Sequence, residues 1–333
     1  MLIDAAARLE PEALRCPFPA YAELREAGVT WVAPANAYLV TRAEDVDTVL
    51  RDTEAFSSRN AIGAPPIPAD SELARHVPFL LLSDEPEHAQ RRKLVQRAFT
   101  PSRLNKFEPR IRELSTGLVE SWRGRTEVEF MADFAVPLPI TVITTVLGLP
   151  VEETAELRRL SEELAGTVGH AGTDPAEIIR IATEFGALLA PSLDAAATAE
   201  SEDTVLQTIA AAGLDRQDAT RFVMELLLAG NITTTDHLGN SMVLLAGDPE
   251  LADRLRAEPA RLATFIEESL RLESPIQGLF RMATRDTEVG GTPIPAGSRL
   301  QVMYAAANRD PGFVDRPDDL DLDRARASSH PGC

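Results

Sequence analysis

The chain has 333 residues, 44% of them hydrophobic, and a formal net charge of −19 at pH 7. That length supports one large domain or two ordinary ones with an ample core. So negative a charge argues against nucleic acid and anionic membranes as partners. The two cysteines, Cys16 and Cys333, exclude a disulfide framework and a thiol metal cluster, and they suit a cytoplasmic protein. No basic leader and no apolar run of about 18 residues is present, so neither a signal peptide nor a membrane span is expected.

The N-terminal part of the sequence alternates helical and strand patterns. An amphipathic helix is predicted within residues 11–29, two short strands at 30–32 and 37–40, and a second helix at 41–50. Residues 59–80 are rich in proline and glycine and lack periodicity. Irregular loops of this length often carry function, although a mobile surface loop is the alternative.

A strong helix start at Ser83–Glu87 introduces a basic helical segment. His88 and Arg92 are four residues apart, so they share one face of that helix. Two cationic donors on one face, beside apolar residues, can hold a buried carboxylate. By spacing alone the alternative is favoured, a solvated basic face, because Arg91 and Lys93 flank Arg92.

From Pro101 onward helix follows helix. The pattern predicts helices over 102–123, 140–150, 152–165 and 175–197, with a strand-like stretch at 128–130 and a linker at 169–176. No internal repeat occurs, and no boundary is sharp enough to separate two domains. Residues 1–333 are therefore expected to form a single domain.

The segment 217–245 is the longest apolar helical pattern in the chain. Apolar residues lie on nearly every side of it, which predicts that most of this helix is buried. Its middle, Ala229-Gly230 followed by Thr233-Thr234-Thr235, is a poor helix former. Two interpretations fit this pattern equally well. Either a flat or reactive group presses against the helix there, or another helix crosses at Ala229/Gly230 while the hydroxyls bond to their own backbone.

The C-terminal part combines a possible ion pair with a change to short strands. Glu268 and Arg271 lie three residues apart on an apolar helix. If exposed, such a pair contributes little; if buried, it leaves guanidinium donors that can anchor a third segment. After Gln277 short strands follow, and Arg281 stands among apolar neighbours as a half-buried cation that needs an anion.

Several motifs in collinear order resemble one known family. They are VTRAEDVDTVL with FSS, DEPEHAQRRKLVQRAFTP, LLLAGNITTT, EESLRLESP, FRMATRD, and PAGSRLQVMYAAANRDP with RPDDLDLDR. From about Tyr21 to Arg326 the chain resembles the soluble bacterial cytochromes P450, which are heme-thiolate monooxygenases. The resemblance implies a mostly α fold with small β-sheets, a triangular prism around a long central helix.

The resemblance assigns cofactor-binding roles residue by residue. His88 and Arg92 match the pair that binds one propionate of heme, and Arg281 matches the strand arginine that binds the other. Ala229 and Gly230 match the small residues that let the central helix approach the heme. The cofactor implied is iron protoporphyrin IX.

The resemblance also implies catalytic and structural residues. Thr233 matches the threonine that helps to protonate iron-bound dioxygen, and Thr234 follows it directly. Glu268 and Arg271 match a structural pair that holds the loops beneath the heme.

The sequence departs from the family pattern in two places. Ile232 stands where the family usually has an acid before the threonine, and Asn231 or Asp236 could substitute for it. The chain also ends before the family's Phe-x-x-Gly loop and its cysteine ligand. Cys333 comes several residues too early and is a poor candidate for the iron ligand.

Three hypotheses follow. The first is a monooxygenase, C-terminally incomplete through frameshift, pseudogenisation or cloning, that oxidises a lipophilic small molecule with electrons from a ferredoxin or flavoprotein. Its pocket would draw on residues 59–80, 160–190, Ile232 and 275–279. The second is a heme-free homologue that acts as a helper protein for another enzyme. The third, an unrelated helical scaffold, is disfavoured by the order of the motifs.

Overall fold

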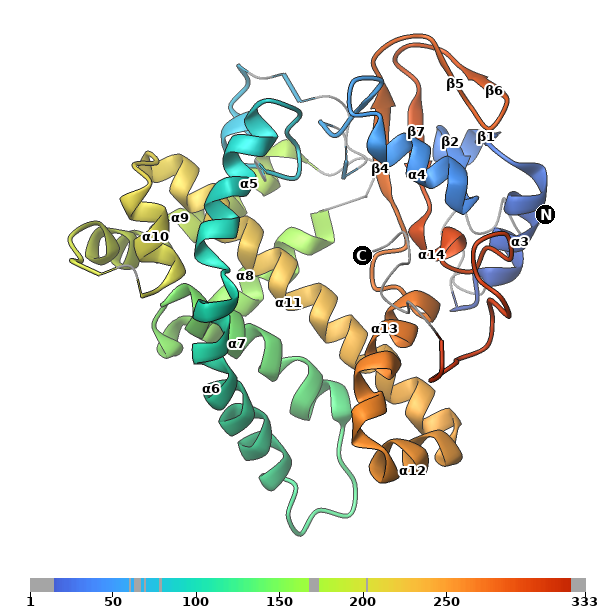
Figure 1. Cartoon of the computed structure of the whole chain (residues 1–333). Helices are drawn as coiled ribbons and strands as arrows, with labels where there is room; N and C mark the ends of the chain where they lie inside the picture. The colour runs from blue at the N-terminus through green and yellow to red at the C-terminus, as the bar shows by residue number, and fades with distance from the viewer. Residues whose placement is uncertain are drawn as a thin grey trace. The chain divides into compact units, whose positions relative to one another are not determined.

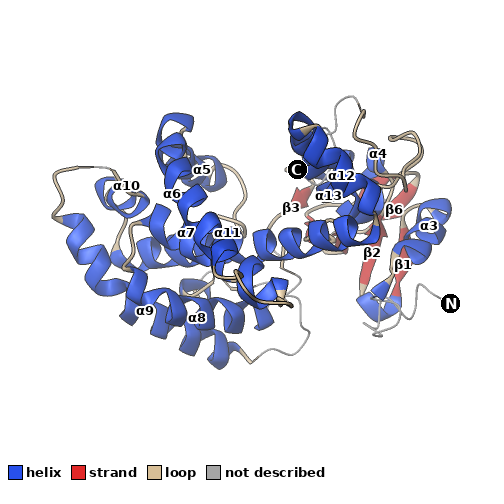
Figure 2. Cartoon of the chain, turned by 90° about the horizontal axis from the view of Figure 1, so that it is seen from below, coloured by secondary structure: helices blue, strands red, loops and turns tan. Residues whose placement is uncertain are grey.

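The computed structural model describes residues 15–59, 61–62, 67–68, 70–77, 80–167, 174–201 and 203–324. Two compact units are present: a sheet unit, Met1–Ile62 with Asn240–Cys333, and a helical unit, Gly63–Gly239. All described strands belong to the sheet unit (Figure 2). That the two units act as one domain stays a prediction.

The sheet unit contains a five-stranded sheet with the order β1-β2-β7-β4-β3. Its strands are β1 (Thr30–Val32), β2 (Ala37–Val40), β3 (Phe56–Ser57), β4 (Leu279–Ala283) and β7 (Arg299–Val302). The β2–β7 pair is parallel and the other pairs are antiparallel. The strands β5 (Thr287–Val289) and β6 (Thr292–Ile294) form a separate hairpin, whose turn places Gly290 and Gly291 at positive φ.

Five described helices complete the sheet unit: α3 (Phe18–Ala27), α4 (Ala43–Arg51), α12 (Pro249–Ala257), α13 (Leu262–Leu272) and α14 (Tyr304–Ala307). Alternate strand residues such as Val40, Leu300 and Val302 are fully buried, and Val46 of α4 packs in the same cluster. The alternation follows from the two-residue period of a strand, which turns one set of side chains toward the helix.

The helical unit packs seven described helices (Figure 1). They are α5 (Glu87–Ala98), α6 (Pro101–Glu120), α7 (Pro137–Leu147), α8 (Thr154–Thr167), α9 (Pro175–Ala197), α10 (Val205–Ala211) and the first part of α11 (Arg216–Gly247), which continues into the sheet unit. Phe185 and Phe222 are among the largest buried side chains of its core. No described helix is long and apolar enough to span a bilayer.

Three local expectations are wrong. Helix α5 begins at Glu87, and the Ser83 hydroxyl donates to Leu80 O instead of capping it. Residues 128–130 form no strand; they lead into a π-helical turn, Met131–Ala135. Helix α11 is buried only in its first half: its buried residues end at Asn231, and the apolar side chain of Val243 is 71% exposed because few other surfaces pack against this end of the helix.

Candidate functional site

The most extensively bonded polar group of the sheet unit is the guanidinium of Arg271, which is fully buried. It donates from Nε to Glu268 Oε1 at 2.8 Å and from Nη2 to Glu268 Oε2 at 3.0 Å, a bidentate pair. Its remaining donors reach three backbone carbonyls, those of Asn308 (3.0 Å), Pro317 (2.6 Å) and Asp319 (2.9 Å). The pair thus ties α13 to the irregular segment that follows α14.

Glu268 receives two further donors from that segment. The Asp321 N–H donates to its Oε2 at 3.0 Å, and Arg324 Nε forms an ion pair with its Oε1 at 2.8 Å. Burial raises the pKa of Glu268, but the hydrogen bonds from Arg271, Asp321 and Arg324 outweigh burial and hold that pKa below its ordinary value. Sequence reasoning missed Arg324, although it stands in the run RPDDLDLDR that carried part of the resemblance.

The run Asn308-Arg309-Asp310 also anchors the sheet unit, and sequence reasoning gave it no role. Arg309 donates to Leu272 O at 2.9 Å, pairs with Asp318 at 3.0 Å and lies 3.6 Å above the Phe18 ring. Asp310 Oδ2 accepts the Ala43 N–H at the start of α4. These contacts join the run to α13, α3, α4 and the segment around Asp318, so this group is structural.

Arg281 differs from these arginines because it has no carboxylate partner among the described residues. It is half-buried on β4, opposite Leu300 of β7. One nitrogen donates to Phe280 O at 2.8 Å. Burial raises the pKa of Tyr304, and the neighbouring Arg281 guanidinium opposes that rise. A half-buried cation of this kind keeps donors available for an anion.

His88 and Arg92 share one face of α5, as their spacing requires. The His88 side chain is 33% exposed, and its Nδ1 lies 3.2 Å from Glu85 Oε1. Arg92 is exposed and has no hydrogen-bond partner in the part of the chain that the structure describes. These two residues belong to the helical unit, and Arg281 belongs to the sheet unit.

The middle of α11 has the geometry of a helix crossing at Gly230. A Cβ built there would lie 3.1 Å from Ile143 Cδ1 of α7. The Thr233 hydroxyl donates to Ala229 O at 2.7 Å, one turn back. Ala229 and Thr234 are exposed. Gly230 therefore serves helix packing, and the approach of Ala229 and Gly230 to a cofactor stays a prediction.

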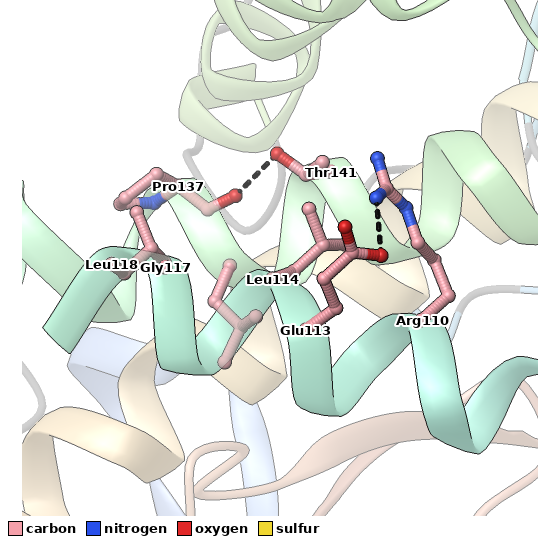
Figure 3. A pocket seen from close by; sticks show the side chains of 8 residues that line it. Arg110, Glu113, Leu114, Gly117, Leu118, Pro137 and Thr141 are labelled. Atoms are coloured by element: carbon pink, nitrogen blue, oxygen red, sulfur yellow. Dashed lines mark hydrogen bonds and ion pairs between the residues drawn. The ribbon is translucent and has the colours of Figure 1, made fainter. Parts of the chain in front are cut away.

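A cavity of about 350 Å³ lies between α6 and α7 in the helical unit (Figure 3). Its polar side chains already have partners: Arg110 donates to Glu113 at 2.7 Å, and the Thr141 hydroxyl donates to Pro137 O at 2.7 Å. None of the residues singled out from the sequence lines it. The polar side chains at this cavity therefore already bond to protein atoms.

Comparisons with known proteins place the chain in a family. The family model for cytochrome P450 matches residues 192–325. The erythromycin C-12 hydroxylase of Saccharopolyspora erythraea is 34% identical over 311 residues, covering 90% of this chain and 76% of that protein. The vitamin D(3) 25-hydroxylase of Pseudonocardia autotrophica is 32% identical, covering 92% and 77%. The structure of CYP109Q5 from Chondromyces apiculatus matches with a TM-score of 0.85 and 33% identity, covering 96% and 81%.

The chain belongs to the cytochrome P450 family. The fold class expected from the sequence, mostly helical with small β-sheets, is confirmed as the cytochrome P450 fold. The function is heme-dependent oxidation of the P450 type, an oxidoreductase activity.

The charged residues described above fit heme. An acid group of the porphyrin suits Arg281, whose half-buried charge no described carboxylate neutralises. A second acid group suits His88 and Arg92, whose side chains lie on one face of α5. Cys333, the thiol weighed as an iron ligand, lies outside the described residues.

Proposed function

We propose that this P450-type oxidoreductase is a cytoplasmic monooxygenase that acts on a lipophilic small molecule as one domain, with electrons from a ferredoxin or flavoprotein. Both hydroxylases compared above bear names that denote oxidation of a small organic molecule, which supports the substrate class. The observation that carries the proposal is Arg281, a half-buried cation without a described counter-ion on a strand whose sequence, FRMATRD, is part of the family pattern.

The proposed residue roles follow from charge and position. Arg281 binds one heme propionate, and His88 with Arg92 binds the other. Bound heme supplies the activation of dioxygen. The protein's own part is to orient the cofactor through these three side chains and to deliver protons through the Thr233 hydroxyl, with Thr234 beside it. Glu268 and Arg271 hold the segment after α14 in place.

Heme binding provides the direct test. The full chain should bind heme with a Soret band, and the reduced, CO-bound form should report whether a thiolate ligates the iron. Arg281→Gln should weaken heme binding about tenfold or more, since a hydrogen bond to a charged group is worth roughly 1.5–3 kcal/mol. Arg285→Gln is the matched control, because Arg285 is exposed and pairs only weakly with Asp52, 3.6 Å away.

Equal heme affinity in the Arg281→Gln and Arg285→Gln variants would show that Arg281 does not bind heme. Absence of any Soret band in the wild-type chain would favour the alternative function, a heme-free helper protein. No observation favours that alternative. A half-buried arginine without a counter-ion costs folding free energy, and a protein that binds no heme would have no propionate to offset that cost.

The electron donor can be located through lysine chemistry. The chain has only two lysines, Lys93 on α5 and Lys106 on α6, and both are exposed. Helix α5 carries four Lys or Arg residues and one acidic residue on a protein of charge −19, and such a local positive charge suits an acidic ferredoxin. A carbodiimide joins lysine amines to carboxylates, so crosslinks to a ferredoxin should map to Lys93 or Lys106. Lys93→Gln should remove most of the crosslinking at low salt, and crosslinks confined to the N-terminal amine would contradict this docking site.

A further inference from the structure

Helix α11 carries a row of charged side chains along one face of its buried first half. Asp218, Arg221 and Glu225 follow one another at intervals of three and four residues, so their side chains are neighbours on the helix. Phe222 and Met224, which stand between them in the sequence, are buried. Charged groups beside a core cost folding free energy unless they are paired or hydrogen-bonded. The partners of this row therefore indicate what it holds in place.

The carboxylate of Glu225 holds two consecutive main-chain amides of the segment before α5. Its Oε2 accepts the Leu80 N–H at 2.9 Å, and its Oε1 accepts the Leu81 N–H at 2.7 Å. A carboxylate offers one oxygen to each N–H, whereas the nitrogen of a carboxamide would face a donor. Hydrogen bonds to an ionised acceptor are roughly twice as strong as neutral ones. Glu225 is therefore suited to fix this part of the main chain.

Arg221 holds the same segment slightly earlier in the sequence. Its Nε donates to Val77 O at 2.9 Å, its Nη1 donates to Asp218 Oδ1 at 2.9 Å, and its side chain is only 16% exposed. Burial lowers the pKa of Arg221, the Asp218 carboxylate opposes that shift, and the positive charge of Arg91 on α5 adds to it. Arg91 thus lies close enough to α11 for its charge to act on this row.

Hydrogen bonds continue from the two held amides into the first turn of α5. The Ser83 N–H and hydroxyl both donate to Leu80 O, at 3.2 and 2.7 Å. The His88 N–H donates to Asp84 O at 2.9 Å, and the His88 ring nitrogen Nδ1 lies 3.2 Å from Glu85 Oε1. A displacement of Leu80 would therefore be passed on to His88 within a few residues.

We propose that Glu225 is a positioning residue for His88 and Arg92. By holding the amides of Leu80 and Leu81, its carboxylate fixes the start of α5, and with it the place of these two side chains. The inference rests on the proposed function, which assigns a heme propionate to His88 and Arg92. Glu225 acts through the main chain of the held segment and not by contact with the cofactor. Its loss lowers the fraction of molecules that are competent to bind, and the apparent heme affinity falls with that fraction.

The first test needs no cofactor. In the full chain with Glu225→Gln, amide hydrogen exchange should become about tenfold faster or more at Leu80 and Leu81, and the increase should extend to His88. Exchange in α9 should stay as in wild type. Glu120→Gln is the matched control, because it removes the same charge from a side chain on α6 that is 58% exposed. An increase confined to Leu80 and Leu81 would overturn the positioning of α5.

The second test compares heme with heme dimethyl ester, in which both propionate acids are blocked. Glu225→Gln should weaken the binding of heme on the order of tenfold, because fewer molecules present both side chains in the binding position. The same variant should bind the dimethyl ester as wild type does, since the ester offers no anion to these side chains. A general loss of structure would weaken the binding of both ligands alike.

A variant without the positioned side chains completes the test. In the His88→Gln/Arg92→Gln double variant, adding Glu225→Gln should weaken heme binding no further, because coupled residues are not additive. Full additivity, or an equal loss of affinity for heme and its dimethyl ester, would contradict the inference. Absence of heme binding by the wild-type chain would instead refute the proposed function, and hydrogen exchange at His88 would still decide whether Glu225 positions α5.

Discussion

Asp45 is a buried carboxyl with little compensation. It is 5% exposed, its Oδ2 has no hydrogen-bond partner, and both carboxyl oxygens lie against the Gly290 backbone, where a built Cβ would meet them at 2.8 Å. Burial first, and then the charge of Glu44, raise the pKa of Asp45, while Arg42 opposes them. Because the folded state favours the protonated form, stability contributed by this group is lost as pH rises through the folded pKa.

We therefore expect Asp45→Asn to raise the free energy of unfolding at pH 7 by about 1 kcal/mol. The gain should vanish below pH ~4, where unfolded aspartate is also protonated. Urea unfolding at several pH values measures it. Asp47→Asn, an exposed neighbour paired with Arg51, should change stability by less than about 0.5 kcal/mol. Destabilisation by Asp45→Asn at pH 7 would mean that the helix N-terminus of α4 stabilises the charge more than burial opposes it.

Spacing predicted some residues of the site and could not predict others. Glu268 and Arg271 are three residues apart on one helix, so their contact can be predicted from the sequence spacing. Arg324 joins them across a long stretch of chain, and only the tertiary fold reveals that contact. The same holds for Gly230, whose neighbour Ile143 belongs to another helix. Local periodicity carries no information about such partners.

The helical glycines differ in what surrounds them. A Cβ added at Gly186 of α9 would lie 3.8 Å from Thr220 Cγ2, an ordinary contact. At Gly230 it would lie 3.1 Å from Ile143, and at Gly239 it would lie 2.8 Å from the Met131 sulfur. Helix propensity favours alanine at all three positions, so packing decides the sign of each substitution.

Gly186→Ala should therefore stabilise the protein by up to about 1 kcal/mol. Gly230→Leu should destabilise it by about 1–3 kcal/mol, because the added atoms overpack the contact with α7. Thermal unfolding of the two variants side by side measures the contrast. A stabilising Gly230→Leu would show that α7 and α11 can separate freely at this point.

Periodicity predicted most helices of the helical unit, including α8 and α9, because long amphipathic patterns are strong signals. The π-helical turn Met131–Ala135 was missed, since its sequence, VEF followed by MADFA, alternates too briefly to distinguish strand from helix. The exposure of Val243 was also not predicted from the apolar composition of α11. Burial depends on which other elements pack against a helix, and the residues of the helix alone do not determine it.

Stability of the chain against acid should depend on the network around Glu268. The pKa of Glu268 is lower in the folded than in the unfolded chain. Its contribution to the free energy of unfolding is therefore present above the unfolded pKa and is lost as pH falls through the folded pKa. Several segments meet at this carboxylate and its partner Arg271, so protonation loosens them together. We expect cooperative unfolding to begin below pH ~4.5, the range where free glutamate titrates.

Glu268→Gln should cost about 3–5 kcal/mol at pH 7, because it leaves the buried Arg271 charge unpaired. The difference from wild type should shrink as pH falls, and urea unfolding at a series of pH values checks it. Glu288→Gln, at an exposed position on β5, serves as the control. A cost that stays constant with pH would show that Glu268 keeps its proton state throughout.

Side chains of α11 form hydrogen bonds with main-chain atoms of the loop that precedes α5. Arg221 donates to Val77 O at 2.9 Å, and the Glu225 carboxylate accepts the N–H groups of Leu80 and Leu81 at 2.9 and 2.7 Å. In these three hydrogen bonds the loop contributes only main-chain atoms, so substitutions of the Val77, Leu80 and Leu81 side chains leave the bonding groups in place. If this loop lines the substrate pocket, as the sequence leads us to expect, a change of substrate preference can arise there while the anchoring side chains on α11, the helix that carries Thr233, stay the same.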